Sequence, residues 1–144
     1  MNRELVIVLI SGLLIVGCQD KMKEVPEDKF IGHWEIKGRN MFEGIQIKIE
    51  RNENQLVGRI TRLNDNKFVK IFAETNDIWV SEIRRSSNFE FMLTERKIGK
   101  DLFSLYGLST SQKFTAQFID DNTIGLGVET SDPQDSKIIY KRVE

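Results

Sequence analysis

The sequence predicts an all-β domain, preceded by a signal-peptide helix, in which antiparallel strands follow one another as an up-and-down meander and close into a barrel of eight to ten strands. Three observations predict this fold. Apolar and polar residues alternate in several short segments after residue 30. Residues typical of tight turns separate these segments at intervals of roughly 8 to 13 residues. No segment of this part keeps a helical period, so we expect at most one short turn of helix there.

The alternation is clearest where Ile45, Ile47 and Ile49 are separated by polar residues, and it recurs in three later segments. We count nine or ten strands, which are expected near 32–38, 44–51, 55–63, 67–73, 77–84, 89–97, 101–108, 112–119, 122–129 and 137–143. A sheet with one apolar face must hide that face, and closure into a barrel also removes the free edges. A two-sheet sandwich is the alternative, but its crossovers need longer connections than this chain offers.

The inside of the predicted barrel is expected to be crowded, because a barrel of about eight strands holds its own side chains or one small ligand. The bulky residues expected to point inward are Phe72, Phe89, Phe91, Leu93, Phe114, Phe118 and Ile124. If they fill the lumen, a partner at the open end is favoured over a ligand inside. If the lumen is open, the residues expected to line a ligand cavity are Phe89, Phe91, Phe114, Phe118 and Tyr140.

The N-terminal segment is expected to direct and tether the chain. An apolar run of 12 residues, 5–16, follows Arg3. This run is shorter than the roughly 20 residues that a membrane-spanning helix needs, and it has the length of a signal-peptide core. The only cysteine stands directly after it, in the sequence Ile15-Val16-Gly17-Cys18. This sequence resembles the lipobox of bacterial lipoproteins, in which the cysteine becomes lipidated and N-terminal after cleavage.

The lipobox resemblance implies a signal peptide at residues 1–17 and a lipidated Cys18 that starts a tether over residues 18–29. Seven charged residues and Pro26 occupy 19–29, so we expect this tether to be disordered. The resemblance also implies a lipid anchor in the cell envelope, at the outer membrane in preference to the inner one. The alternative is an ordinary secretory signal, with Cys18 as an incidental thiol.

Two short motifs lie at the ends of the predicted barrel domain, residues 30–144. The sequence Phe30-Ile31-Gly32-His33-Trp34 resembles the Gly-x-Trp opening of the first strand in the calycins, which are the lipocalins, fatty-acid-binding proteins and avidins. Arg142 stands in a last strand similar to theirs. The resemblance implies a lipocalin-like barrel in which Trp34 plugs one end. The guanidinium of Arg142 is expected to stack on its indole ring as a cation–π contact.

Composition excludes several classes of function. Lys plus Arg is 21 and Asp plus Glu is 22, so the net charge of -1 provides no positive field to attract nucleic acid. One His and one Cys cannot form a structural zinc site or an internal disulfide. His33 is expected to face solvent because it alternates with Trp34, and no serine stands in a nucleophile motif. We therefore expect no enzyme, no catalytic residue, no metal and no cofactor.

These observations favour a membrane-anchored, non-enzymatic binding domain that takes a small apolar ligand or a partner protein of the envelope. Two basic clusters, Arg84-Arg85 and 96–100, are expected near adjacent hairpin ends, where they suit anionic lipid head groups or an acidic partner. Ordinary solvated loop charge is the simpler explanation for both. The alternative function is an inhibitor or immunity-type lipoprotein that blocks an enzyme with a barrel-end loop, for which 39–43 and 130–136 are the candidates.

Overall fold

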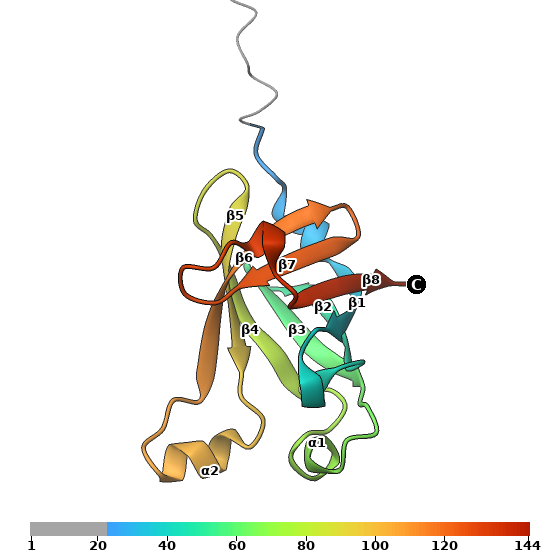
Figure 1. Cartoon of the computed structure of the whole chain (residues 1–144), viewed down its shortest axis with the longest axis vertical. Helices are drawn as coiled ribbons and strands as arrows, with labels where there is room; N and C mark the ends of the chain where they lie inside the picture. The colour runs from blue at the N-terminus through green and yellow to red at the C-terminus, as the bar shows by residue number, and fades with distance from the viewer. Residues whose placement is uncertain (1–22) are drawn as a thin grey trace, which may run out of the picture.

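The computed structural model describes residues 23–144, apart from the side chains of 101–103, and it is a closed antiparallel β-barrel (Figure 1). The predicted signal peptide and Cys18 lie outside the described residues. Each of the eight strands pairs with its neighbours in sequence, and the last strand pairs with the first. The predicted all-β meander and its closure into a barrel are confirmed.

The strands are β1 (Gly32–Lys37), β2 (Gln46–Asn52), β3 (Gln55–Arg62), β4 (Ile78–Arg85), β5 (Glu90–Arg96), β6 (Ser111–Asp120), β7 (Thr123–Gly127) and β8 (Ile139–Val143). The helices are α1 (Lys67–Phe72) and α2 (Lys100–Leu105), together with the 3-10 turns η2 (Glu27–Phe30), η3 (Asn40–Phe42) and η4 (Pro133–Asp135). Over residues 23–144, none of these helices has the length and apolar character needed to cross a bilayer.

The alternating segments face the lumen as the pattern predicts. Ile45, Ile47 and Ile49 are completely buried, and the residues between them are half-buried. Phe91 on β5 and Phe114 on β6 are buried in the same apolar cluster. The lumen is therefore filled by side chains from all around the barrel, as in a close-packed protein interior.

One end of the barrel carries the plug that the first and last strands suggest. The guanidinium of Arg142 lies 4.2 Å from the centroid of the buried Trp34 ring. The indole Nε1 of Trp34 donates to the carbonyl of Phe30 (2.8 Å), and Arg142 donates to the carbonyl of Ile31 (3.1 Å). At Gly32, with φ +140°, a Cβ would stand 2.7 Å from Nη1 of Arg142. Glycine is favoured there because other residues rarely adopt this φ, and a Cβ would also displace the guanidinium.

The strand predicted over 67–73 is wrong, because this segment forms α1. The side chain of Asn66 accepts a hydrogen bond from the backbone N–H of Val69 (3.1 Å) and caps the helix. Phe68 and Phe72 are four residues apart, so they lie on one face of the helix, with ring centroids 4.7 Å apart. Phe72 is consequently 39% exposed and does not fill the lumen.

The strand predicted over 101–108 is also wrong, and with it the expectation of at most one helical turn. Gly99, with φ +73°, turns the chain out of β5 directly before α2, a conformation that glycine adopts without strain. Leu105, Tyr106 and Leu108 are all exposed. Residues 104–108 are all exposed and therefore give the barrel no inward face, which a ninth strand would require.

The disorder predicted for 19–29 does not hold for its described part, because residues 24–29 contact the barrel. The backbone N–H of Val25 donates to the turn between β4 and β5 (2.7 Å). Phe30, at the end of η2, is completely buried, with its ring centroid 4.8 Å from that of Phe91 and 4.7 Å from that of Phe118. These apolar contacts are between segments far apart in sequence, so composition alone did not reveal them.

A filled lumen makes the barrel sensitive to truncation of one buried ring. Phe114→Ala is expected to lower the free energy of unfolding by about 3 to 5 kcal/mol, because the packed wall cannot collapse onto the vacated volume. Phe89→Ala is the matched control, since Phe89 is 54% exposed, and it should change stability by about 0.5 kcal/mol or less. Urea denaturation followed by circular dichroism measures both. Equal losses in the two variants would contradict a filled lumen.

Candidate functional site

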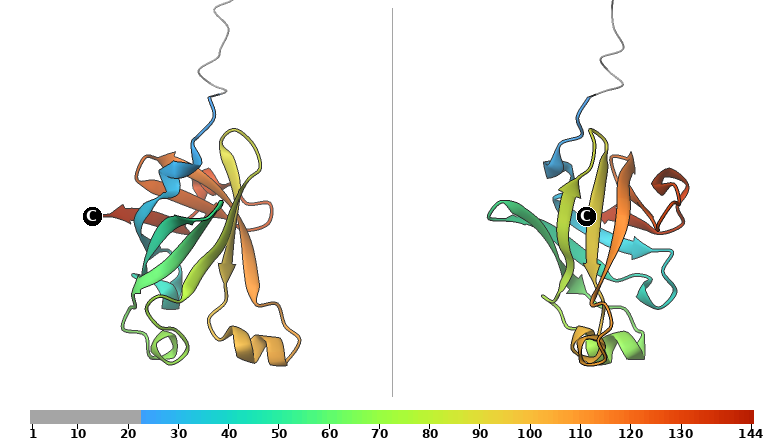
Figure 2. Two further views of the ribbon diagram at one scale, coloured as in Figure 1. Left: turned by 180° about the vertical axis from the view of Figure 1, so that it is seen from behind. Right: turned by 90° about the vertical axis from the view of Figure 1, so that its left-hand side faces the viewer.

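The two α-helices lie at one end of the barrel, whereas the first described residues lie at the other end (Figures 1 and 2). Between the helices and the barrel mouth is a hollow of about 790 Å³, which we call the helix-end hollow. Its apolar lining consists of Ile60, Ile71, Phe72, Ala73, Ile78, Trp79, Ile98 and Leu105. The helix-end hollow therefore joins α1, α2 and the adjacent ends of β3, β4 and β5.

Exposed apolar side chains are concentrated around this hollow. Ten large apolar side chains are exposed in the described part of the chain, and six of them belong to α1, α2 or the residues just after α2. Ile71 and Leu105 are 74% and 79% exposed. Three of these six side chains, Ile71, Phe72 and Leu105, line the hollow itself. Exposed apolar surface next to polar groups is typical of an interaction site.

The polar groups around the hollow are mostly basic. They are Arg59, Asn76, Asp77, Arg96, Lys97 and Lys100. Arg59 donates to the carbonyl of Asn76 (2.9 Å). Arg96 and Lys100 form no ion pair with any side chain that the structure describes. Among the residues whose side chains the structure describes, the rim thus has an excess of positive charge, which favours an acidic partner.

The floor of the hollow rests on a buried polar cluster. The indole Nε1 of Trp79, which lines the hollow, donates to Glu95 Oε1 (3.0 Å) and to the hydroxyl of Tyr140 (3.1 Å). That hydroxyl donates to the same carboxylate oxygen, and Arg39 Nη1 donates to Oε2 (2.7 Å). Glu95 is only 2% exposed. Each carboxylate oxygen is therefore satisfied inside the barrel, where an unpaired charge would be costly.

The cluster also closes this end of the lumen. The guanidinium of Arg39 lies 5.1 Å from the ring centroid of Phe42 and 5.2 Å from that of Phe114. The ring of Phe42, on η3, meets the Trp79 ring edge-on at 5.2 Å. Burial raises the pKa of Tyr140 well above its ordinary value of 10.0, and the neighbouring charge of Glu95 raises it further. The polar groups of this cluster form hydrogen bonds with one another, and no buried side-chain polar atom of the described residues lacks a partner.

The five residues predicted to line a ligand cavity do not all face the lumen. Phe91, Phe114 and Tyr140 do face the lumen, where they are packed in its core. Phe118 is half-buried near the Trp34 plug, with the ring centroids 6.2 Å apart. The inward position predicted for Phe89 is wrong, because this residue stands in the turn before β5, where the alternation has not begun.

The two basic clusters are not neighbours, contrary to the expectation. Because β4 and β5 are antiparallel, Arg85 pairs in register with Phe91 near the start of β5, whereas Arg96 ends that strand. The cluster 84–85 therefore lies at the end near the first described residues. The cluster 96–100 lies at the helix end, on the rim of the hollow.

Neither loop proposed for an inhibitor projects freely from the barrel. In 39–43, Glu43 Oε2 accepts from the backbone N–H of Gly38 (2.6 Å), and Arg39 points into the lumen. The loop 130–136 packs flat on β7, where a Cβ at Gly125 would stand 1.9 Å from the carbonyl oxygen of Pro133. Both loops are held by contacts within the domain.

Sequence reasoning missed three members of the buried cluster, Arg39, Trp79 and Glu95. A signal existed for Glu95, because it continues the buried series Phe91 and Leu93 at a spacing of two. An acidic residue at such a position is normally assigned to the surface. Its burial depends on a guanidinium 56 residues away along the chain, which no local pattern reveals.

Fold and site together define a small antiparallel barrel with a filled lumen and an open, apolar hollow at one end. Comparison of the chain with protein-family models, with curated proteins and with solved structures gave no match. Over the described residues, no group of His, Cys, Asp and Glu side chains is placed to hold a metal ion.

The raised pKa of Tyr140 predicts an alkaline loss of stability. Above a pH of about 10 the unfolded phenol loses its proton while the folded one keeps it, so the free energy of unfolding falls as pH rises. Tyr140→Phe should be less stable near neutral pH and should show a shallower fall above pH 10. The measurement is urea denaturation between pH 8 and pH 11. Tyr106→Phe, outside the cluster, is the matched control and should keep the wild-type slope.

Proposed function

We propose that this protein is a lipid-anchored binding protein of the bacterial cell envelope, which docks an apolar and acidic segment of a partner protein in the helix-end hollow. The observation that carries the proposal is the concentration of exposed apolar side chains around a hollow with a basic rim. In this role the protein acts by binding and catalyses no reaction.

The exposure of the lining favours a protein partner over a small apolar molecule. Small-molecule sites usually enclose about 70 to 90% of the ligand surface. Here Ile71, Leu105 and Tyr106 project into solvent, and the lumen behind them is occupied. Protruding aliphatic and aromatic side chains are instead typical anchors at protein interfaces, where they enter pockets of the partner.

The charge of the rim supports an acidic partner. Arg96 and Lys100 stand at the edge of the hollow without an ion pair to any described side chain, and Asp77 is the acidic residue in the lining. Complementary charge at the edge of an apolar contact steers association and orients the partner. The inhibitor alternative has less support, because both of its candidate loops are held against the barrel.

The anchoring part of the proposal rests on the lipobox-like sequence that ends at Cys18. The first described residues lie at the opposite end of the barrel from α1 and α2 (Figure 1), whose residues line the helix-end hollow. An anchor at the N-terminus would leave the hollow facing the aqueous compartment, where a partner can reach it.

Anchoring is tested by Cys18→Ser in the full-length protein. This variant should lose metabolic labelling by palmitate and move from the membrane to the soluble fraction, because it lacks the thiol that receives the lipid. Cell fractionation with immunoblotting measures the change. Retention of the variant in the membrane fraction would contradict a lipid anchor at Cys18.

Partner binding is tested by site-specific photocrosslinking in cells. Leu105→p-benzoylphenylalanine should give one discrete adduct with a second protein. The same residue placed at Ile119, which is exposed outside the hollow, is the matched control and should give none. Adding Ile71→Glu or Arg96→Glu should lower the adduct yield about tenfold, since loss of an anchor costs about 1.4 kcal/mol or more. Arg84→Glu should leave the yield unchanged.

The mass of the adduct separates the competing occupants. A partner protein with acidic residues at the crosslink supports the proposal. An adduct of twice the chain mass would mean self-association, and a small mass increase would mean a small apolar ligand. Either result, or the absence of any adduct, would overturn partner binding at the hollow.

A further inference from the structure

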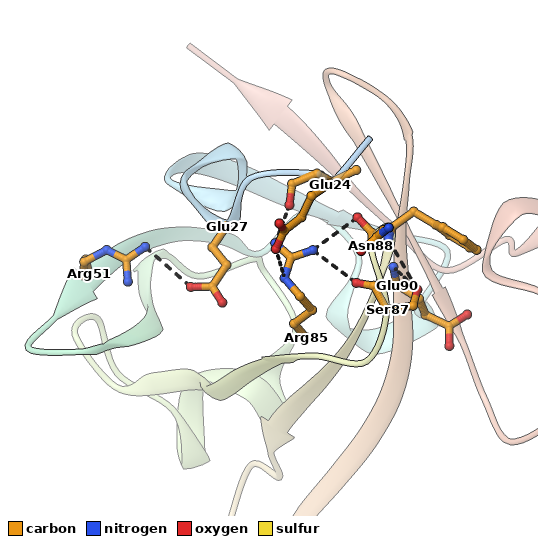
Figure 3. A network of polar contacts seen from close by, with 9 residues as sticks. Glu24, Glu27, Arg51, Arg85, Ser87, Asn88 and Glu90 are labelled. Atoms are coloured by element: carbon orange, nitrogen blue, oxygen red, sulfur yellow. Dashed lines mark hydrogen bonds and ion pairs between the residues drawn. The ribbon is translucent and has the colours of Figure 1, made fainter. Parts of the chain in front are cut away.

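The guanidinium of Arg85 bridges the start of the described chain and the turn between β4 and β5. Its Nη2 donates to the carbonyl of Val25, and its Nη1 donates to the carbonyls of Ser87 (3.1 Å) and Asn88 (3.2 Å). Its Nε pairs with Glu24 (3.1 Å), as Figure 3 shows. We call this set of contacts the Arg85 clip.

The clip is held in place by the barrel itself. The guanidinium of Arg85 lies 4.7 Å from the ring centroid of Phe91, which is completely buried. The backbone N–H of Val25 donates to the carbonyl of Asn88 (2.7 Å), and the side chain of Val25 packs partly on the core. The chain therefore leaves the barrel beside this turn, in a fixed position.

Little chain remains between the clip and the cysteine. Six peptide steps separate Cys18 from Glu24, the first residue of the clip, and a fully extended chain of that length spans about 22 Å at most. A tether that began only at residue 30 would reach about 40 Å and would let the barrel turn freely. The Arg85 clip thus brings one particular face of the barrel within reach of the lipid anchor.

We propose that this face, centred on the β4–β5 turn 86–89, rests on the membrane surface and that the ring of Phe89 lies in the lipid interface. The proposal rests on the lipid anchor proposed above. Phe89 stands in this turn and is 54% exposed, so its ring can enter a surface that the turn rests on. Aromatic side chains at the head-group level gain from burying an apolar ring there.

The charges around this end indicate which kind of lipid surface it fits. The cations there are largely matched by acids of the same end. Arg51 pairs with Asp28 (2.6 Å), and Lys29 pairs with Asp121 (2.9 Å). Such a face has no excess of positive charge to attract anionic lipids. The partner is therefore a zwitterionic lipid surface, held by the anchor and the ring rather than by charge.

The inference is tested by tryptophan placed at each end of the barrel. Phe89→Trp and Phe68→Trp are purified as lipidated protein and incorporated into phosphatidylcholine vesicles with and without brominated acyl chains. Phe68 is exposed on α1 at the opposite end, so it is the matched control. The wild-type protein, with the buried Trp34 and Trp79, gives the baseline. Brominated lipid should reduce the added emission of Phe89→Trp at least twofold and leave that of Phe68→Trp unchanged.

A second pair of variants tests the clip. Arg85→Ala in the Phe89→Trp protein should reduce the quenching, because the released chain no longer holds the turn at the membrane. Arg84→Ala, at the neighbouring exposed position, should leave the quenching as it was, and circular dichroism verifies that both variants are folded. Protein that stays on the vesicles with Phe89→Trp unquenched, or with Phe68→Trp quenched equally, would overturn the inference alone. Protein that does not stay on the vesicles would overturn the anchor as well.

Discussion

The buried carboxylate of Glu95 is the constraint on which the helix end of the barrel depends. A charge inside a closed barrel must be paired, and removing one partner of such a pair costs about 3 to 5 kcal/mol. Its partners come from three separate parts of the chain: Arg39 follows β1, Trp79 belongs to β4 and Tyr140 belongs to β8. Satisfying one carboxylate therefore ties the first, middle and last strands together.

At each end of the barrel an arginine guanidinium lies over an aromatic ring, but the two ends differ in what they close. At one end Arg142 lies over Trp34 and binds the carbonyls of the incoming chain, so this end is sealed and joined to the N-terminal segment. At the other end Arg39 points inward to Glu95, and the lumen is closed below the surface. Above that closure, α1 and α2 leave an apolar hollow open to solvent.

The sequence predicted the barrel well because alternation is a local property. Ile45, Ile47 and Ile49 face inward in any sheet with one buried face, whatever its partners are. The two strands that were predicted wrongly, 67–73 and 101–108, lie in segments where apolar and polar residues do not alternate. The segment 67–73 is rich in apolar residues but does not alternate, and Phe68 and Phe72 have the i, i+4 spacing of a helix, which the cap from Asn66 also favours. The hollow could not be predicted, because it is formed by two segments that were expected to be strands.

The sequence by itself determined the strand order and the inward isoleucines, because these follow from side-chain period and from short turns between successive strands, while the contact of Trp34 with Arg142 was implied by the resemblance to the calycins. Tertiary structure alone decided that Glu95 is buried, that Val25 is clipped by Arg85 and that α1 and α2 share one hollow. Each of these depends on groups brought together from distant positions by closure of the barrel. Whether a charged side chain is paired or solvated is decided by such neighbours and not by its place in a pattern.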